Sequence, residues 1–416
     1  EHMDIILRSN IPKLSRIFLI TKRYVYFCLK SIMNFFSTNK KLGILGGGQL
    51  GKMILYTTRK WDIQTHVMDP KIDSPSRLAC DNFFLGDLMN YKSVINFGSE
   101  LDILTLEIEY VNVKALYELE KNGVKIYPQP SVLEIIQNKS KQKNFYKKNN
   151  IPTSNFKTFP NLEAIKNYVA KGNLSYPFVW KAATMGYDGY GVSIIRKNKD
   201  LESIIDCECI IEDLVSIKSE LSVIVARREN GEVKTFPVVE MEFDSISNQV
   251  EYVISPARIS NKIRLKAIKL AEKVSEKFRH IGVLAVEMFL TETDELIINE
   301  VAPRPHNSGH LTIESSYTSQ FEQHVRSILN LPLGKSDNKI PAVMVNLVGK
   351  KEKSGPVVYK NIDQILVMEG VTPHIYGKKQ TNPNRKMGHV TIVNKNLNEA
   401  LKIAREVKSI IEVISA

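Results

Sequence analysis

The stretch KLGILGGGQLGKM, residues 41–53, constrains the fold more than any other part of the 416-residue sequence. Gly46, Gly48 and Gly51 have the spacing G-x-G-x-x-G, and they separate a short apolar run from a segment with helical periodicity. This pattern is typical of the first strand, turn and helix of a nucleotide-type domain, where backbone N–H groups at a helix N-terminus approach an anionic ligand. The pattern alone leaves open whether that ligand is NAD or another molecule.

Alternating strands and helices continue after this turn. Strands are predicted at 41–47, 64–70, 102–109 and 124–130, and helices at 49–61, 90–97 and 111–123. Such alternation predicts an open parallel sheet with helices on both faces.

The pattern changes after a basic helix that is predicted at 138–150. Strands are then expected at 177–183, 191–196, 209–215, 219–228, 235–243, 283–290, 295–303, 342–349 and 389–393, and helices between 196 and 209, at 262–278 and at 397–411. The chain is therefore predicted to be an α/β protein, α+β overall, and its length suggests two or three domains.

The composition is that of a globular enzyme, since 43% of the residues are apolar. A formal net charge of +12 raises the alternative of nucleic-acid binding. The basic residues are spread along the chain, however, and the densest run, at 138–148, lacks the interleaved aromatic residues of a single-strand binder. We interpret that run as a solvated helix face.

The cysteines Cys28, Cys80, Cys207 and Cys209 form neither a disulfide framework nor a C-x-x-C pair. Reduced thiols in a cytoplasmic protein are expected, and a zinc site at Cys207 and Cys209 is the alternative. Residues 1–37 are interpreted as an extension, with EHM as a tag scar and Met33 as the natural start. A targeting segment or a surface helix is the alternative, because charges interrupt each apolar run before it reaches transmembrane length.

Two carboxylates, Glu287 and Glu300, lie on neighbouring predicted strands. A two-residue turn at 293–294 would place them directly opposite each other, where like charges are destabilising unless a cation compensates them. Magnesium takes carboxylate oxygens together with substrate phosphates, so a magnesium site is favoured over a pair of exposed surface acids. Their neighbours on that face would be Phe289 and Ile298.

Two basic segments have the features of phosphate sites. Lys181 ends an apolar strand before the glycine-bearing turn 182–191, which can direct a cation and backbone N–H groups at phosphate. Near the C-terminus, Lys378, Arg385 and Lys386 surround a turn and form a candidate clamp for a substrate phosphate. The alternatives are an ordinary glycine hairpin and a solvated turn.

The segment NEVAPRPHNSGH, residues 299–310, concentrates anion-binding groups. Prolines stiffen the backbone on both sides of Arg304, and His306, Asn307 and His310 follow at once. This density favours a binding function over packing.

Taken together, the motifs GILGGGQLGKM, GYDGYG, NEVAPRPHNSGH and RKMGH resemble, in order and spacing, those of the N5-carboxyaminoimidazole ribonucleotide synthase family of ATP-grasp enzymes. The resemblance runs from about residue 41 to the C-terminus. It implies the ATP- and bicarbonate-dependent carboxylation of 5-aminoimidazole ribonucleotide through carboxyphosphate, in purine biosynthesis. It also implies a Rossmann-like preATP-grasp domain at 38–140, an ATP-grasp domain at 141–335 with a mobile lid at about 152–217, and a small β-rich C-terminal domain at 336–416.

The resemblance also implies the ligands and the residues that hold them. ATP and Mg²⁺ are the expected cofactors, and the protein is expected to be a cytoplasmic homodimer that binds neither nucleic acid nor membrane. Lys139 and Lys181 would meet the ATP phosphates, 186–192 would form the phosphate loop of the lid, 212–215 would read the adenine edge, and Glu220 would hold the ribose. The full ATP set is Lys139, Lys181, Gly186, Tyr187, Asp188, Gly189, Tyr190, Gly191, Val192, Glu212, Asp213, Leu214, Val215, Glu220, Asn299 and Glu300.

The remaining roles concern the metal and the other substrates. Glu287 and Glu300 would bind magnesium, and Arg304, His306 and Asn307 would bind bicarbonate and carboxyphosphate, with His306 as the candidate general base. The ribotide would contact Gln49, Leu50, Tyr187, an acid of EIE (Glu107 or Glu109) and, through its phosphate, Lys378, Arg385 and Lys386.

Three positions qualify the resemblance. Phe243 stands where many relatives have histidine, and Lys139 stands where arginine is frequent. Strict strand alternation turns Asn299 away from Glu300, so a backbone role is expected for it.

Two other activities are weighed against this one. The formate-dependent glycinamide ribonucleotide transformylase, also an ATP-grasp enzyme, is the close alternative. An NAD-linked oxidoreductase is suggested by the glycine turn and by Asp69 at the end of the second strand. That interpretation leaves Glu287, Glu300 and the cluster around Arg304 unexplained.

Overall fold

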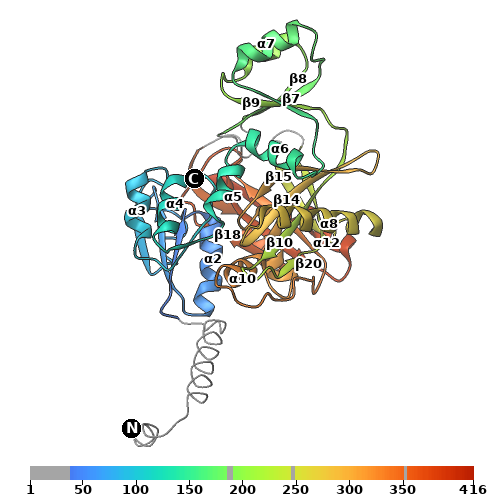
Figure 1. Cartoon of the computed structure of the whole chain (residues 1–416). Coiled ribbons are helices and arrows are strands. Elements are labelled where there is room, and N and C mark those ends of the chain that lie inside the picture. The colour runs from blue at the N-terminus through green and yellow to red at the C-terminus, as the bar shows by residue number, and fades with distance from the viewer. Residues whose placement is uncertain (1–37, 185–190, 245–248, 351–353) are drawn as a thin grey trace, which may run out of the picture. The chain divides into compact units, whose positions relative to one another are not determined.

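The computed structural model describes residues 38–184, 191–244, 249–350 and 354–416 (Figure 1). The expected extension at 1–37, with Met33 and Cys28, lies outside the described residues, and so does the segment 185–190. No helix in the described ranges is long and apolar enough to cross a bilayer.

The first sheet is parallel and has helices on both faces, as the sequence predicts. Its strands pair in the order β3-β2-β1-β4-β5. They are β1 (Lys41–Leu45), β2 (Gln64–Asp69), β3 (Asn82–Leu85), β4 (Ile103–Leu106) and β5 (Lys125–Ile126), with the helices α2 (Gln49–Lys60), α3 (Tyr91–Gly98) and α4 (Val113–Lys121) between them. β3 was not predicted, because its mostly exposed residues show no apolar alternation.

A second, larger sheet is antiparallel. In the part of the chain that the structure describes, its order is β15-β14-β10-β12-β13-β16-β20-β18, with β11 paired to β10. Its strands are β10 (Ile217–Arg227), β11 (Val233–Thr235), β12 (Val239–Phe243), β13 (Val250–Ser255), β14 (Gly282–Thr291), β15 (Leu296–Ala302), β16 (Ala342–Val348), β18 (Val371–Ile375) and β20 (Lys386–Val393). Because β16 pairs with β13, the strands β16, β18 and β20 extend the sheet that begins in the expected ATP-grasp domain.

The two faces of this sheet have different roles. The helix α8 (Asn261–Phe278) packs its apolar side, with Ile263, Ala267 and Val274, against alternate residues of β10 and β14 (Figure 1). The opposite face carries Ser222 and Glu287, which pair across β10 and β14. Polar side chains on this face, opposite the apolar face that α8 covers, mark it as the candidate site.

A third sheet, in the order β6-β9-β7-β8, has its own core and corresponds to the expected lid. Its strands are β6 (Phe156–Phe159), β7 (Phe178–Ala182), β8 (Val192–Ile195) and β9 (Cys209–Asp213), and α7 (Leu162–Ala170) packs with them. The helix predicted between 196 and 209 is only a short 3₁₀ turn, η1 (Asn198–Ser203). Cys207 and Cys209 both pack into this core.

The remaining elements are helices, a 3₁₀ turn and three strands that form a separate small antiparallel sheet. The predicted basic helix is α6 (Lys139–Lys148), and the predicted terminal helix is α12 (Leu397–Ile410). The others are α5 (Pro130–Ile136), η2 (Asn307–Gly309), α9 (Thr312–Ser315), α10 (Gln320–Ile328), α11 (Ile362–Leu366), β17 (Gly355–Lys360), β19 (Gln380–Thr381) and β21 (Glu412–Ser415).

Candidate active site

The hairpin of β14 and β15 pairs Glu287 with Glu300, which confirms the sequence prediction. The turn that was expected to produce this pairing is nevertheless wrong. Leu290 pairs with Leu296, so the loop has three residues, 292–294, and not two. Asp294, the last of them, has a left-handed backbone with φ 58°, which is common in three-residue hairpin loops.

A β-bulge compensates for the extra loop residue. Glu287 pairs with Glu300 but Met288 pairs with Ile298, which leaves Asn299 as the inserted residue. Ile298 is 1% exposed and packs in the core beneath α8, so the expectation that it neighbours the carboxylates is wrong. The bulge also breaks strict alternation, and the side chain of Asn299 accepts a hydrogen bond from Lys181 Nζ (3.1 Å). Asn299 therefore is not turned away from the site.

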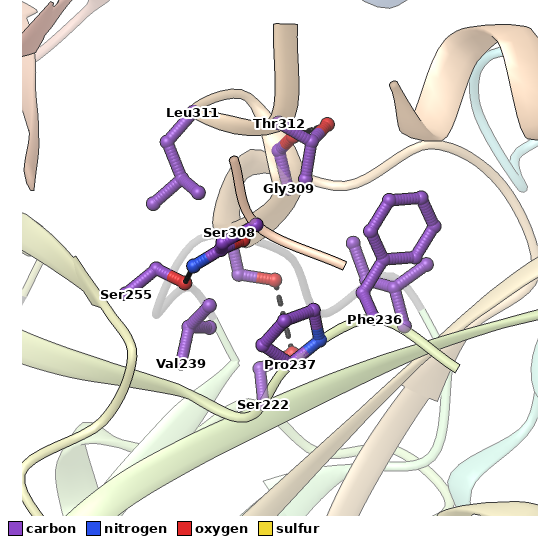
Figure 2. Close-up of a pocket in the computed structure, with 11 residues that line it drawn as sticks. Ser222, Phe236, Pro237, Val239, Ser255, Ser308, Gly309, Leu311 and Thr312 are labelled. Atoms are coloured by element: carbon purple, nitrogen blue, oxygen red, sulfur yellow. Dashed lines mark hydrogen bonds between the residues drawn. The ribbon is translucent and has the colours of Figure 1, made fainter. Parts of the chain in front are cut away.

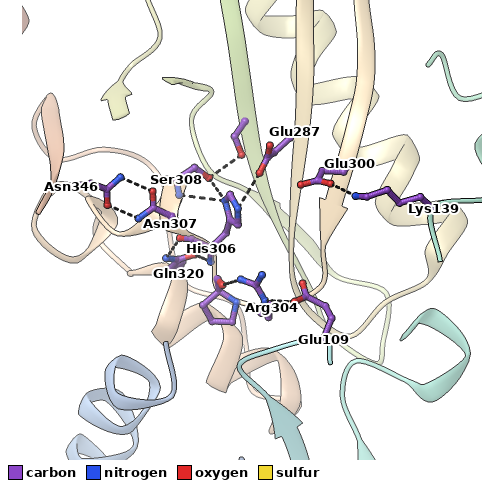
Figure 3. A network of polar contacts seen from close by, with 12 residues as sticks. Glu109, Lys139, Glu287, Glu300, Arg304, His306, Asn307, Ser308, Gln320 and Asn346 are labelled. Carbon is purple, nitrogen blue, oxygen red and sulfur yellow. Dashed lines mark hydrogen bonds and ion pairs between the residues drawn. The ribbon is translucent and has the colours of Figure 1, made fainter. Parts of the chain in front are cut away.

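Two lysines face the carboxylate pair. Lys139, the first residue of α6, donates from Nζ to Glu300 Oε2 at 2.8 Å (Figure 3). This ammonium group lowers the pKa of the Glu300 carboxyl to about 2. Burial opposes the charge on Lys139, but Glu300 raises its pKa above the ordinary value. Lys181 of β7 reaches the same hairpin through Asn299, so the two lysines expected at the ATP phosphates lie at the carboxylate pair.

Glu220 adds a third carboxyl group. It lies two residues before Ser222 on β10, and therefore on the face that carries Glu287. Burial raises the pKa of Glu220 to about 7, and the negative charges of Glu287 and Glu300 act in the same direction.

A magnesium ion fits these residues only as a site with two protein carboxylates. The described ranges contain no group of three or more His, Cys, Asp or Glu side chains placed to hold a metal. Glu287 and Glu300 supply hard oxygen ligands, and magnesium completes its shell with water and substrate phosphate when a protein offers one or two carboxylates. The pair is therefore suited to a metal that arrives with a nucleotide.

The lid carries the other residues expected at ATP. Gly186, Tyr187, Asp188, Gly189 and Tyr190 lie outside the described residues. Beside them, Gly191 has φ 74° and its carbonyl accepts the Ala182 N–H (2.9 Å), while Val192 pairs with Lys181. The described end of the predicted phosphate loop, Gly191 and Val192, therefore lies next to Lys181.

The expected hinge, 212–215, lies at the end of β9. Glu212 is 4% exposed, and its carboxylate forms ion pairs with Lys143 (2.8 Å) and Lys181 (3.0 Å). Burial alone would raise the pKa of Glu212, but these two ammonium groups lower it. Beyond it, Asp213 accepts from Asn155 Nδ2 (2.8 Å), Leu214 is 40% exposed and Val215 is partly buried. The contact of this segment with adenine stays a prediction.

His306 is oriented by contacts on both ring nitrogens. Its Nε2 lies 3.0 Å from Glu287 Oε1, and its Nδ1 receives the Ser308 N–H (3.3 Å) and contacts Ser308 Oγ (2.9 Å; Figure 3). A backbone N–H can only donate, so Nδ1 is the acceptor and a neutral His306 carries its proton on Nε2. His306 therefore presents an N–H at Nε2, 3.0 Å from Glu287 Oε1, an arrangement that favours a hydrogen-bond donor over the expected general base.

Two buried hydroxyl groups, of Ser308 and Ser222, lie in a row beside His306. Ser308 Oγ lies 2.9 Å from Ser222 Oγ, and both residues line a cavity of about 10 Å³ (Figure 2). This volume suits a single water molecule. The cavity is too small for a substrate, so it belongs to the support of the site.

The neighbours of His306 are also fixed by buried contacts. Arg304 Nε donates to Glu109 Oε2 (2.8 Å), which places Glu109 of the EIE segment at this cluster. Asn307 and Asn346 exchange two amide hydrogen bonds, of 2.9 and 3.0 Å. Gln320 accepts the His306 N–H (2.8 Å) and donates to the His306 carbonyl (2.7 Å; Figure 3). The three residues expected to bind bicarbonate thus lie together on one rigid segment.

The glycine turn holds a carboxylate of the protein itself. Glu107 Oε1 accepts the Gly48 N–H (2.6 Å), and Oε2 accepts those of Leu50 (3.0 Å) and Gly51 (2.9 Å). Asp69 likewise accepts the Gly47 N–H (2.7 Å). The anion that the G-x-G-x-x-G pattern requires at the N-terminus of α2 is therefore Glu107 in this structure, and both features that suggested NAD are used inside the protein.

The residues expected at the ribotide come from both ends of the chain. Gln49 and Leu50 form the first turn of α2, where the Leu50 side chain is buried in the core. Lys52 of the same helix donates to the carbonyls of Ile375 (3.1 Å) and Tyr376 (3.2 Å).

The expected phosphate clamp follows directly after that contact. Lys378 Nζ donates to the Lys386 carbonyl (2.7 Å), and Arg385 donates to the Gln380 carbonyl (2.6 Å). The first turn of α2 therefore contacts the segment that leads into the expected clamp.

Sequence reasoning missed several residues that shape the site. Lys143 was interpreted as part of a solvated helix face, but its side chain is only 3% exposed. Its spacing of one helical turn from Lys139 was a signal that both leave the same side of α6. Gln320 and Asn346 gave no signal, because they contact His306 and Asn307 from positions that the sequence alone does not relate to them. Ser308 lies inside the segment 299–310, but nothing in the sequence indicated that it orients His306.

Family models match three consecutive parts of the chain. Residues 39–137 match the ribonucleotide synthetase preATP-grasp domain, residues 144–321 the ATP-grasp domain, and residues 342–403 the phosphoribosylaminoimidazole carboxylase C-terminal domain.

Curated relatives cover most of the chain. It is 38% identical over 357 residues to the N5-carboxyaminoimidazole ribonucleotide synthase of Bacillus subtilis. The match covers 85% of this chain and 91% of that protein. It is 36% identical over 377 residues to the phosphoribosylaminoimidazole carboxylase of Candida glabrata, but it covers only 65% of that longer protein.

Solved structures agree with these matches. The N5-carboxyaminoimidazole ribonucleotide synthetase of Thermotoga maritima superposes with a TM-score of 0.83 at 42% identity, over 91% of this chain and all of that one. The N5-carboxyaminoimidazole synthase of Aspergillus clavatus, in complex with ADP and 5-aminoimidazole ribonucleotide, gives a TM-score of 0.81 at 31% identity, over 90% of this chain and 99% of that one.

Proposed function

The chain belongs to the N5-carboxyaminoimidazole ribonucleotide synthase family of ATP-grasp proteins, and from this premise we propose that it carboxylates 5-aminoimidazole ribonucleotide with ATP and bicarbonate. The product is N5-carboxyaminoimidazole ribonucleotide, an intermediate of purine biosynthesis, so the protein is a C–N ligase. The observation that carries this proposal is the cross-strand pair of Glu287 and Glu300 with Lys139 and Lys181 beside it.

The first step transfers the γ-phosphoryl group of ATP to bicarbonate. A bicarbonate oxygen attacks the γ-phosphorus, ADP leaves, and carboxyphosphate forms. Lys139 and Lys181 bind the negative oxygens of the phosphates, because positioning and charge stabilisation supply most of the catalysis in phosphoryl transfer. A magnesium ion held by Glu287 and Glu300 would neutralise charge on the phosphates.

Arg304, His306 and Asn307 hold bicarbonate and then carboxyphosphate. His306 contributes a hydrogen-bond donor at Nε2, because the Ser308 N–H fixes Nδ1 as an acceptor. In the structure that donor points at Glu287, so the imidazole lies between the metal ligand and the bicarbonate cluster. Arg304, oriented by Glu109, supplies the positive charge.

The second step forms the new C–N bond. The exocyclic amine of the ribotide attacks the carboxyl carbon, phosphate leaves, and the amine loses a proton. Lys378, Arg385 and Lys386 bind the ribotide phosphate, and Gln49 and Leu50 border the ribotide from the α2 side. Support comes from the contact of Lys52 with the segment that leads to this clamp.

Release of phosphate from ATP tests the proposal. It is expected to depend on both bicarbonate and 5-aminoimidazole ribonucleotide, with omission of each as the control. Turnover of ATP that is indifferent to the ribotide would contradict the proposal.

The alternatives have their own controls. Formate-dependent turnover with glycinamide ribonucleotide would favour the transformylase, and tight NAD binding in calorimetry would favour the oxidoreductase. A homodimer in the cytoplasm stays a prediction, which light scattering and cell fractionation test.

A further inference from the structure

Lys143 has no role in the function proposed above, yet its surroundings are unusual for a lysine. It follows Lys139 by one turn of α6, so both side chains leave the same side of the helix. Lys141, between them, is exposed and pairs with Glu134 (2.8 Å). Only 3% of the Lys143 side chain is exposed. An ammonium group buried to this extent needs both hydrogen bonds and a compensating charge.

Three acceptors surround Lys143 Nζ. It donates to Thr153 Oγ1 (2.6 Å) and Ser154 Oγ (3.0 Å), and it lies 2.8 Å from Glu212 Oε1. The two hydroxyl groups accept hydrogen bonds from the ammonium group, and the Glu212 carboxylate supplies the compensating charge. Burial lowers the pKa of Lys143 to about 8, against the opposing effect of Glu212. Lys143 therefore acts on the site through its neighbours and not by touching a ligand.

Glu212 connects Lys143 to the predicted phosphate lysine. Its Oε2 lies 3.0 Å from Lys181 Nζ and accepts from Ser154 Oγ (2.9 Å). One buried carboxylate is thus shared by two ammonium groups, and Lys181 also donates to Asn299. Because Lys143 compensates part of the negative charge of Glu212, Lys181 has less of that charge to compensate.

The same contacts join the parts of the chain that meet at the nucleotide. Thr153 Oγ1 donates to the Ile298 carbonyl (2.8 Å), next to Asn299 and Glu300 on β15. The Lys139 N–H donates to the Ala183 carbonyl (2.7 Å) at the end of β7. Lys143 lies where α6, the strand β15 and the start of the lid come together.

We propose that Lys143 is a positioning residue of the nucleotide site, which balances the charge of Glu212 so that Lys181 remains available to the phosphates. The inference rests on the proposed function, because it takes the ligand to be ATP. Without Lys143, the buried Glu212 would be compensated by Lys181, and the nucleotide phosphates would compete with a desolvated ion pair for the same ammonium group.

Calorimetry with ADP and with adenosine tests the inference, because only ADP carries phosphates. Lys143→Met is expected to weaken ADP binding roughly tenfold or more and to leave adenosine binding unchanged. The double variant Lys143→Met/Glu212→Gln removes both charges and is expected to regain most of the lost ADP affinity. Lys141→Met, on the exposed side of α6, is the matched control and is expected to bind ADP as the unmodified chain does.

Three results would overturn the inference. They are an unchanged ADP affinity of Lys143→Met, an equal loss of adenosine and ADP affinity, and a double variant no better than the single one. If Lys143→Met does not fold, the double variant is compared with Glu212→Gln instead. A lower ADP affinity of the double variant than of Glu212→Gln then overturns the inference. Failure of the unmodified chain to bind ADP would refute the proposed function instead.

Discussion

Four buried histidines predict that the protein loses stability in mild acid. Among the described residues, His280, His310, His324 and His389 are at most 1% exposed. Burial lowers the pKa of His280 and of His324 to about 3, and it lowers those of His310 and His389 well below the ordinary value. In the unfolded chain each imidazole titrates near about 6.5. Below that pH the unfolded state binds more protons than the folded state, so stability falls as the pH falls.

The size of the effect follows from the same values. Each histidine costs about 1.4 kcal/mol at about pH 5.5 and almost nothing at about pH 7.5. The four together remove about 6 kcal/mol, and Glu220, whose pKa is raised to about 7, offsets about 2 kcal/mol of this. The net loss of about 4 kcal/mol is a large part of a typical folding free energy of about 5–15 kcal/mol. Urea denaturation at these two pH values measures the difference.

A single variant identifies the source of the acid sensitivity. His280→Gln keeps a side-chain N–H for the Val225 carbonyl, which lies 3.3 Å from His280 Nε2, but it has no proton to gain. It is expected to reduce the acid-induced loss by about 1.4 kcal/mol. His66→Gln, at a partly buried histidine, is the control and is expected to change the loss less. Equal stability at both pH values, or an unchanged loss in His280→Gln, would refute the reasoning.

Three further predictions concern the site. Glu107→Ala leaves three backbone N–H groups without their acceptor and is expected to lower the free energy of unfolding by about 2–4 kcal/mol, as measured by urea denaturation. The exposed control Glu120→Ala is expected to leave the free energy of unfolding unchanged. Glu300→Gln removes an expected metal ligand, so electron paramagnetic resonance should show Mn²⁺ binding with ADP weakened about tenfold or more; unchanged binding would place the metal elsewhere. Ser308→Ala removes a hydroxyl group from His306 Nδ1 and is expected to lower kcat about tenfold with the KM for ATP unchanged, whereas a raised KM alone would contradict the role given to His306.

Local patterns predicted the elements well, because each element is specified by its own residues. The strand at 41–47, the long helix at 262–278 and the terminal helix at 397–411 occur as β1, α8 and α12. In α8 the buried residues recur every three or four positions, which is the signal that the prediction used. Where a segment is mostly exposed, as in β3, that signal is missing and the strand was missed.

Long-range contacts account for most of what the sequence did not reveal. Lys143 was predicted to be solvated because the helix α6 has the composition of a surface helix. Its acceptors, however, come from the segment that follows α6 and from β9. The hairpin of β14 and β15 also has a feature that local patterns did not predict. The Glu287–Glu300 pair was predicted from a turn that does not exist, and the prediction held because a three-residue loop and a bulge at Asn299 cancel in the register. The bulge then determined which side chains reach the site, and strict alternation would have placed both Ile298 and Asn299 on the wrong face.

The glycine turn shows why a correct motif can suggest the wrong ligand. Its backbone N–H groups require an anion at the N-terminus of α2, and neither their spacing nor their number says which anion. Glu107 meets that requirement from the end of β4, 59 residues beyond Gly48, and a Cβ at Gly48 would lie 2.3 Å from its Oε1. The glycines are therefore needed for the close approach of a carboxylate that belongs to the fold. Asp69 holds Gly47 in the same way, so the motif specifies a turn of the fold. The prediction of the cofactor rests instead on the carboxylates of the β14–β15 hairpin and on Lys139 and Lys181 beside it.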